Sequence, residues 1–352
     1  MASEAAAPLR VGLLPRAGRF GLHLIERFAD GGPFRVVAAV NPATVGGDSL
    51  PLVNLAAALD VRLVSTPQEL FQAEDIDVLW ITSDDGLQQD FAASGFAHGK
   101  HTIAETPLGV TAAMTDKAFA ESAQRDRLFL VHHPRRADLD YRQAQIVAND
   151  RSMGAIRAVK FVSWSYAIPP SRLSRNPLVS GSETGNASDP SGDPQRTKLR
   201  FVAHALDQLV GLIGDRPLSV LAMSDPQALG AADLLSGYSL ALRIVFEKGC
   251  QAEIDIRLDS PTSFQSGWLL TGEHGGYANG RRLTLTDEGE VFDSPVATAD
   301  NDAEADQFEW LAQQIRSGVR NATEEARVRT VAALMDAARQ SLNQGGGVCV
   351  VV

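Results

Sequence analysis

The stretch LRVGLLPRAGRFG, residues 9–21, decides the fold of the first part of this chain. It opens with a short apolar run that predicts a buried strand, and a turn containing glycine follows. Beyond the turn, apolar side chains recur at helical spacing as far as Phe28. A strand, a glycine turn and a helix in this order bind the pyrophosphate of a dinucleotide at the helix amino terminus. The stretch therefore predicts a nucleotide site.

The turn departs from the usual glycine fingerprint at its first position. Arg16 stands where a G-x-G-x-x-G pattern begins, whereas Gly18 and Gly21 take the second and third glycine places. The backbone can still approach a phosphate, and the helix can still pack on the strand. Arg16 is either a surface side chain that binds nothing or a guanidinium that pairs with the pyrophosphate. We expect Arg16, Gly18, Arg19 and Gly21 to line a cofactor site.

Further apolar runs predict strands at 34–40, 77–82, 101–104 and 128–131, with helical stretches between them. Strands that alternate with helices form a parallel, doubly wound sheet. We therefore predict an α/β fold of the Rossmann type for a first domain, residues 1–135.

Asn41 follows the second predicted strand, at the place where such folds carry an acid for the adenosine ribose. An amide can also donate and accept hydrogen bonds there. The next residues, Pro42 to Thr44, offer no cation for a ribose phosphate. The cofactor prediction is therefore NAD, with NADP possible if Arg16 or Arg19 turns toward that phosphate.

The chain changes character after residue 135, and we predict a second, α+β domain over residues 136–352. A strand is expected at 156–168, then a loop at 169–198 rich in Pro, Ser, Gly and Asp, which is either a lid or disordered. A helix at 203–213 precedes strands with period-two patterning, as in 250–258. Asn279-Gly280 predicts a hairpin turn, and two helices close the chain. The sheet is therefore expected to be large, open and mostly antiparallel.

Composition narrows the classes of partner. The chain has 352 residues, 44% of them hydrophobic, which is enough for two cores. Its formal net charge of −11 argues against nucleic acid or anionic lipid as a partner, and favours a small molecule. Cys250 and Cys349 are the only cysteines, and no Cys/His spacing for a metal occurs. Without a basic leader or a long apolar run, the expected location is cytoplasmic.

Five motifs in order give the chain a family resemblance. They are VGLLPRAGRFG (11–21), GFAHGKHTIAETPLGVT (95–111), MGAIRAVKF (153–161), HALDQLVGLIGDRP (204–217) and EHGGYANGRRLTLT (273–286). In this order and spacing the chain resembles the glucose–fructose oxidoreductase/inositol dehydrogenase (Gfo/Idh/MocA) family. The resemblance implies an amino-terminal Rossmann domain, an open-sheet domain, and NAD or NADP in a cleft. It also implies redox chemistry on a sugar or cyclitol, and a homo-oligomer, dimer or tetramer, built through the open sheet.

The chain departs from the family pattern at the residues that carry the chemistry. In the family, Glu-Lys-Pro ends the fifth strand and its lysine acts on the reacting hydroxyl, whereas here the tripeptide is Glu105-Thr106-Pro107. A neutral hydroxyl is a poor base, and positioned acid–base catalysis contributes about 10²–10⁴ in rate. We expect Glu105, Thr106 and Ser83, which follows the fourth strand, near the cofactor.

The second catalytic element of the family is an Asp four residues ahead of a His. Here Arg200 stands four residues ahead of His204. On a helix, His204 and Asp207 share one face with Gln208, opposite an apolar face. That polar face is either exposed to solvent or part of the substrate site. In the second case, Asp207 would favour the protonated form of the His204 imidazole. The resemblance makes His204, Asp207 and Arg200 the candidate catalytic residues, and Arg200 could hold a substrate carboxylate or phosphate.

Two further readings stay open from the sequence. His132 and His133, at the domain junction, could line the cleft or form a hinge. The whole protein is either an NAD(P)-dependent oxidoreductase acting on a sugar-like alcohol or ketone, or an inactive relative. The inactive relative would bind a cofactor or sugar as a sensor or accessory subunit, since both the lysine and the aspartate are replaced.

Overall fold

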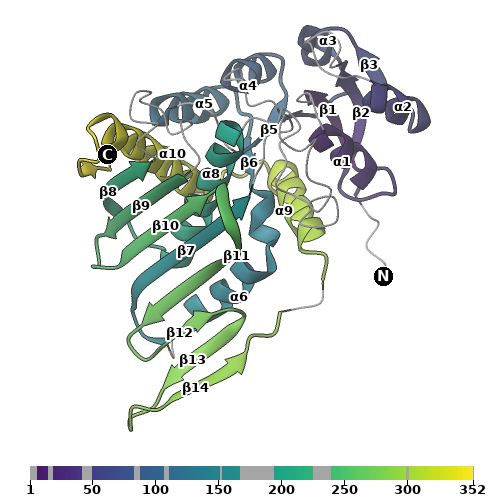
Figure 1. Ribbon diagram of the computed structural model, residues 1–352. Coiled ribbons are helices and arrows are strands. Elements are labelled where there is room, and N and C mark those ends of the chain that lie inside the picture. Colours follow the sequence, from purple (N-terminus) through teal and green to yellow (C-terminus); the bar gives the residue numbers. More distant parts are fainter. Residues whose placement is uncertain are drawn as a thin grey trace. The chain divides into compact units, whose positions relative to one another are not determined.

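The computed structural model describes residues 6–14, 19–41, 50–82, 88–106, 111–150, 153–166, 194–224, 239–298 and 301–351. The chain divides into two compact units (Figure 1). The first comprises residues 1–134 and 302–326, and the second comprises residues 135–301 and 327–352. The segment 302–326, which the sequence placed in the second domain, therefore belongs to the first unit.

The first unit is built on a six-stranded parallel sheet with the order β3-β2-β1-β4-β5-β6. Its strands are β1 (Leu9–Leu14), β2 (Phe34–Val40), β3 (Arg62–Val64), β4 (Val78–Ile81), β5 (His101–Glu105) and β6 (Phe129–His132). The order reverses between β1 and β4, which pair in parallel. Such a switch point opens a crevice at the carboxyl ends of the strands. The predicted doubly wound sheet is confirmed.

Helices connect these strands: α1 (Arg19–Arg27), α2 (Leu50–Ala58), α3 (Pro67–Gln72), α4 (Gln88–Ala97) and α5 (Ala112–Gln124). The strands β1 and β4 are buried through most of their length, as expected for a sheet covered on both faces. Gly12 in β1 allows close packing, because a Cβ there would lie 2.7 Å from Cδ1 of Ile76.

An aromatic cluster explains why α9 (Ala303–Ser317) belongs to the first unit. Phe308 of α9 packs edge-on against Phe28, with ring centroids 4.9 Å apart, and against Trp80 at 5.8 Å. Leu311 and Ile315 extend this face of the helix into the same core. The apolar period of this segment was legible in the sequence, but Phe28 and Trp80, which Phe308 contacts, lie more than 220 residues away in the chain.

The second unit contains a nine-stranded sheet with the order β14-β13-β12-β11-β7-β10-β9-β8-β15. Its strands are β7 (Ile156–Tyr166), β8 (Pro217–Ser224), β9 (Ser239–Phe246), β10 (Gln251–Arg257), β11 (Asp259–Gly272), β12 (Gly275–Ala278), β13 (Arg281–Leu285), β14 (Val291–Pro295) and β15 (Cys349–Val350). Among the described strand pairs of this nine-stranded sheet, β7 and β10 are parallel and the others are antiparallel. The predicted mostly antiparallel sheet is confirmed.

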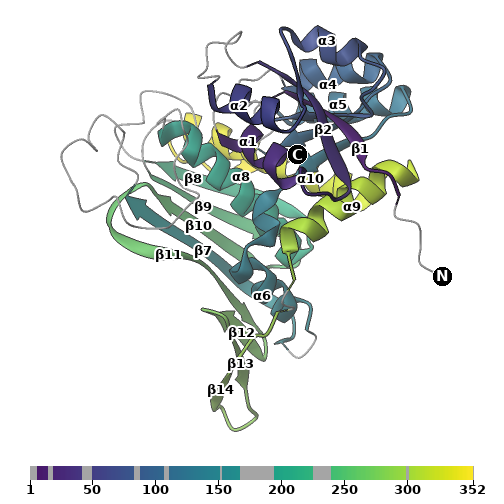
Figure 2. The same ribbon diagram turned by 90° about the vertical axis from the view of Figure 1, so that its right-hand side faces the viewer.

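Helices cover one face of this sheet. They are α6 (Leu139–Ala148), α8 (Pro194–Ile213) and the part of α10 (Ala322–Asn343) that belongs to this unit (Figure 2). In β10, Ala252, Ile254 and Ile256 are buried beneath them, as the period-two pattern predicts. The turn between β12 and β13 holds Asn279 and Gly280 at φ 51° and 74°, which confirms the predicted hairpin.

The region expected to be a loop, 169–198, is only partly described. Residues 167–193 lie outside the described residues, and α8 begins at Pro194. The last residues assigned to the loop are therefore helical, and the helix predicted at 203–213 is longer at its amino end. No helix in the described residues is long and apolar enough to cross a bilayer.

Candidate functional site

The carboxyl ends of β5 and β6 bring four polar side chains together in the first unit. Glu105 ends β5 opposite His132 of β6, and the next residue of each strand, Thr106 and His133, forms a second pair. All four are buried, between 1% and 6% exposed. Because these residues end parallel strands, they lie at the edge where doubly wound sheets bind their ligands.

Glu105 is held by two donors. Its Oε1 accepts a hydrogen bond of 2.7 Å from Nε1 of Trp80 and lies 2.8 Å from Nδ1 of His132. The imidazole of His132 packs against the rings of Trp80 and Phe308, with centroids 5.5 and 5.3 Å apart. Its Nε2 atom is buried and has no hydrogen-bond partner. Glu105, which the sequence analysis expects near the cofactor, is thus hydrogen-bonded to two side chains of the aromatic core of the first unit.

Thr106 and His133 make a second buried pair. The Thr106 hydroxyl donates to the carbonyl oxygen of His132 at 3.0 Å, and its oxygen lies 2.9 Å from Nδ1 of His133. A hydroxyl has one proton, and the carbonyl oxygen can only accept it. The Thr106 oxygen therefore accepts from His133, which carries its proton on Nδ1.

Other groups complete this edge of the sheet. Thr82, directly after β4, donates from its backbone and its hydroxyl to the carbonyl oxygen of Leu14, at 3.0 and 3.2 Å. Gln88, the first residue of α4, donates 3.0 Å to the carbonyl oxygen of Glu105, and its own Oε1 is buried with no hydrogen-bond partner among the described residues. Asn41 follows β2 and is joined to β3 through its backbone N–H and the carbonyl oxygen of Val64. These contacts join the carboxyl end of β4 to that of β1, the end of β2 to that of β3, and the end of β5 to the start of α4. The two histidine pairs join the ends of β5 and β6.

Several residues predicted for the cofactor lie outside what can be described. Arg16, Gly18 and Ser83 are outside the described residues. Arg19 and Gly21 lie in the first turn of α1, but their side chains are not described. The helix α1 is the first described element after β1 in the chain.

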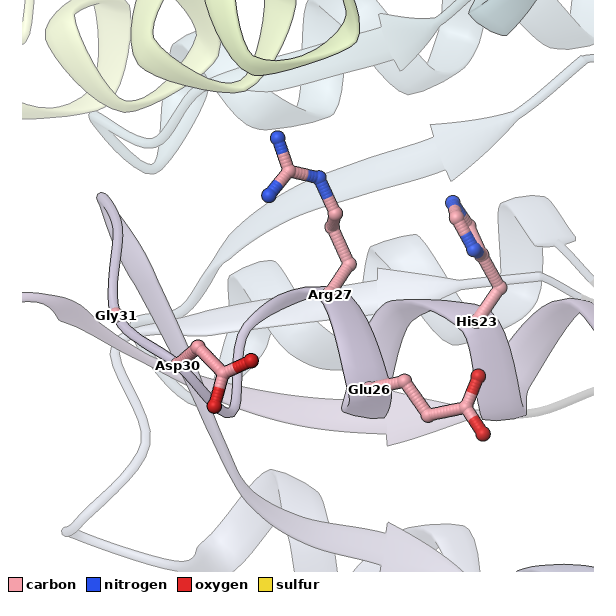
Figure 3. Close-up of a pocket in the computed structure, with 5 residues that line it drawn as sticks. All are labelled: His23, Glu26, Arg27, Asp30 and Gly31. Atoms are coloured by element: carbon pink, nitrogen blue, oxygen red, sulfur yellow. The ribbon is translucent and has the colours of Figure 1, made fainter.

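A pocket of about 320 Å³ lies at the other end of α1, lined by His23, Glu26, Arg27, Asp30 and Gly31 (Figure 3). His23 bonds Glu304 of α9 at 2.9 Å, and Arg27 pairs with Asp302. The hydrogen bond to Glu304 raises the pKa of His23, and the same bond lowers the pKa of Glu304. This pocket precedes β2 and so lies at the amino ends of the strands, away from the crevice that binds nucleotides. The His23–Glu304 and Arg27–Asp302 contacts connect α1 to the start of α9.

In the second unit, Asp207 is clamped by two arginines. Arg136 donates to its carboxylate through Nε and Nη2 at 2.8 and 2.6 Å, and Arg327 of α10 contacts both oxygens at 2.9 and 3.0 Å. The Arg327 guanidinium also donates 2.7 Å to the backbone oxygen of Asp207. Asp207 is completely buried. A carboxylate so paired fixes three segments of the unit to one another.

The polar face of α8 is therefore an interior face over part of its length. Gln208 is 3% exposed, accepts 2.9 Å from Nε1 of Trp268 and donates to the backbone oxygen of Arg135. His204, one turn earlier, is half-buried. Arg200 lies in the same helix, with its side chain not described. The sequence spacing showed the shared face but not that arginines cover it.

Sequence reasoning missed Trp80, Gln88, Arg136 and Arg327. Trp80 gave no signal beyond an apolar strand position, and no spacing in the sequence connects the two arginines to Asp207. The described residues include no group of three or more His, Cys, Asp or Glu side chains that could hold a metal ion.

Residues 14–133 match the model of an oxidoreductase family with an NAD-binding Rossmann fold, Gfo/Idh/MocA. The matched residues lie within the first unit. A curated relative, an inositol 2-dehydrogenase from Ralstonia nicotianae, is 24% identical over 221 residues, which cover 62% of this chain and 58% of the relative. This chain thus matches little more than half the length of that relative.

Solved structures of two inositol dehydrogenases share the fold over nearly the whole chain. The myo-inositol 2-dehydrogenase from Lactobacillus plantarum gives a TM-score of 0.74 at 17% identity, covering 98% of this chain and 100% of that one. A scyllo-inositol dehydrogenase from Lactobacillus casei, solved with NAD(H) and scyllo-inositol, gives 0.72 at 16% identity, covering 98% and 99%. At these identities the likeness shows the fold alone.

Proposed function

We propose that this protein is an NAD-dependent oxidoreductase that transfers hydride between the cofactor and an alcohol or ketone carbon of a cyclitol or sugar-like polyol. The match of residues 14–133 to an NAD-binding oxidoreductase family carries this proposal. The reversal of strand order between β1 and β4 supports it, because the crevice of such sheets receives a dinucleotide.

The residues present fit a dinucleotide. Gly18, Gly21, Arg16 and Arg19 would hold the pyrophosphate, Asn41 the adenosine ribose, and Ser83 and Thr106 the nicotinamide half. The buried, unpartnered Oε1 of Gln88 at this edge suits a ligand that brings a hydrogen-bond donor. The nicotinamide supplies the hydride acceptor or donor when it is bound. The lack of a cation after Asn41 favours NAD over NADP.

His204 is the proposed proton-transfer group of the second unit, and Arg200 the proposed anchor for an anionic substrate group. Asp207 has a different task in this proposal. Its clamp by Arg136 and Arg327 holds α8 in place, and so positions His204 one turn away. Its carboxylate is committed to the two arginines and is not needed as a base.

The substrate class comes from the relatives. The curated relative is an inositol 2-dehydrogenase, and the solved relatives described above are inositol dehydrogenases. An uncharged, hydroxyl-rich ring is thus the proposed substrate. Activity measurements on a panel of inositols would identify the isomer.

A homo-oligomer, dimer or tetramer, is the proposed assembly. The face of the nine-stranded sheet away from its helices carries the exposed apolar side chains Met223, Val245 and Leu269. Light scattering coupled to gel filtration tests this, and a monomer at micromolar concentration would contradict it.

The activity test follows absorbance at the nicotinamide band with NAD⁺ and NADP⁺ over a panel of inositols, other polyols and hexoses, and with the reduced cofactors over the matching ketones. The proposal expects turnover with at least one ring polyol. Cofactor binding without turnover on any of them would favour the inactive relative.

A further inference from the structure

The strand β14 is the end strand of the nine-stranded sheet and leaves one edge of that sheet open (Figure 1). All five of its residues, Val291 to Pro295, are exposed. Val291 is 64% exposed and Phe292 is 59% exposed, and Leu285, opposite Val291 on β13, is 46% exposed. An open edge that carries large apolar side chains is a template for pairing with another strand.

The backbone hydrogen bonds between β13 and β14 show which groups of β14 face the open edge. At the two ends of this hairpin the N–H donors and their carbonyl acceptors, each pair 2.9 Å apart, are Thr286 to Glu290 and Val296 to Gly280. Along an antiparallel ladder, hydrogen-bonded pairs alternate with pairs whose backbone groups point away. In the register of these two strands, Phe292 and Ser294 therefore bond to β13. The residues whose backbone groups point to the open edge are Val291, Asp293 and Pro295.

We propose that β14 pairs antiparallel with β14 of a second copy of this chain, about a two-fold axis beside Phe292. In this register Val291 of one copy and Asp293 of the other exchange both of their backbone hydrogen bonds, and the axis repeats this pair. The two Phe292 side chains lie directly opposite each other, in the closer type of pair, where aromatic contacts stabilise a sheet. The two-fold axis closes the assembly, because each copy uses its own open edge.

Neighbouring two-fold registers are less favourable. An axis beside Asp293 places the two Asp293 carboxylates opposite each other, and it sets Pro295, which has no N–H, against the carbonyl oxygen of Val291. An axis beside Val291 pairs Asp293 with Gly289, whose N–H already donates 3.0 Å to the carbonyl oxygen of Thr286. Only the axis beside Phe292 gives every donor and acceptor of Val291 and Asp293 a partner.

The charges of the hairpin fit this register and favour a second copy as the occupant. Asp293 forms an ion pair with Arg281 of its own chain, so it needs no cation from the other copy. Glu290 lies opposite Ser294 of the second copy, whose hydroxyl can donate to the carboxylate. On β13, Arg282 is the neighbour of that serine and adds a positive charge on the same side. The strand is thus complementary to itself, and no like charges lie directly opposite each other.

Cysteine cross-linking tests the register. Directly opposite residues of the closer type have Cα atoms about 4.5 Å apart, within the range that a disulfide spans. Phe292→Cys should therefore form a covalent dimer under mild oxidation at micromolar protein, whereas the native cysteines are buried. Val319→Cys, at a valine of the first unit that is 65% exposed, is the matched control and should stay uncross-linked. Cross-linking through Asp293→Cys in place of Phe292→Cys would contradict the proposal.

Sedimentation velocity tests whether the edge holds the assembly together. Phe292→Lys places two ammonium groups opposite each other, so the mass of the assembly should fall to half that of the wild type. Val319→Lys should keep the wild-type mass, and because both replaced side chains are exposed, both variants should melt near the wild-type temperature. A Phe292→Lys variant of unchanged mass would overturn the proposal. If Val245→Lys halves the mass instead, the sheet face and not the edge carries the assembly.

Neither test includes cofactor or substrate, so their outcome is independent of the proposed redox function. An inactive protein whose Phe292→Cys variant cross-links would keep this assembly and lose that function. An active protein that sediments as a monomer would keep the function and lose this assembly.

Discussion

Nδ1 of His132 lies 2.8 Å from Oε1 of Glu105, and both side chains are buried where neighbouring parallel strands end. One residue further along, Thr106 holds Nδ1 of His133 in the same way. A dipeptide at the end of β5 thus contacts a dipeptide at the end of β6 through two hydrogen bonds. The first pair also meets Trp80, whose indole donates to the same Glu105 oxygen.

Removing the Glu105 carboxylate should destabilise the first unit strongly. Glu105→Ala leaves the N–H groups of Trp80 and His132 buried without their acceptor, and the expected loss is about 2–5 kcal/mol. Glu105→Gln keeps an acceptor oxygen and should lose less. Chemical denaturation measures both against Glu121→Ala, whose surface pair with Lys117 should change stability by less than about 0.5 kcal/mol. Equal stability of Glu105→Ala and wild type would contradict this role.

Asp207→Asn should unfold the second unit more easily, because two buried guanidinium groups lose their charge partner. The expected cost is about 3–5 kcal/mol, the range for breaking one side of a buried ion pair. Asp336→Asn on α10 is the control, since its pair with Arg339 is partly exposed and should be worth less than about 1 kcal/mol. A stable but inactive Asp207→Asn would instead assign Asp207 to the chemistry.

His204→Ala should remove most turnover and leave the cofactor affinity nearly unchanged, because the residue belongs to the second unit and the cofactor to the first. The expected loss in kcat is about 10²–10⁴-fold. Initial rates and NADH titration of the same preparation measure the two effects. Unchanged kcat would rule out a proton-transfer role for His204.

The pair His23–Glu304 should make the stability of the first unit depend on pH. The raised pKa of His23 contributes stability below its ordinary value of 6.5 that is lost as pH rises through the folded value. The lowered pKa of Glu304 contributes stability above its ordinary value of 4.5 that is lost as pH falls through the folded value. The pair therefore stabilises most between these two ordinary values.

Both side chains are partly exposed, so the effect should stay below about 1 kcal/mol. Glu304→Gln should lower the melting temperature at pH 5.5 and change it less at pH 8.5. Glu309→Gln breaks a pair with Arg316, which does not titrate in this range, and its effect should be the same at both pH values. A Glu304→Gln effect that does not change with pH would contradict the assignment.

Local patterns predicted the elements of both sheets, because strand runs, glycine turns and the Asn279-Gly280 hairpin depend on neighbouring residues. Segment 302–326 was assigned to the wrong unit for the opposite reason, since the core that Phe308 enters is formed by distant residues. The candidate site shows the same limit of local patterns. Helical spacing placed His204 and Asp207 on one face of α8, and the family resemblance pointed to Glu105 and Thr106. The residues that contact Asp207, Glu105 and Thr106 come from other elements, which no local period connects: Arg136, Arg327, Trp80 and His133.

Titration of the protein with NADH, followed by cofactor fluorescence, tests whether the first unit binds a dinucleotide. We expect saturable binding at micromolar concentration, with NADPH bound more weakly because no cation follows Asn41. If neither reduced cofactor binds at millimolar concentration, the crevice at the carboxyl ends of β1 and β4 is not a dinucleotide site, and the assignment as an oxidoreductase is contradicted.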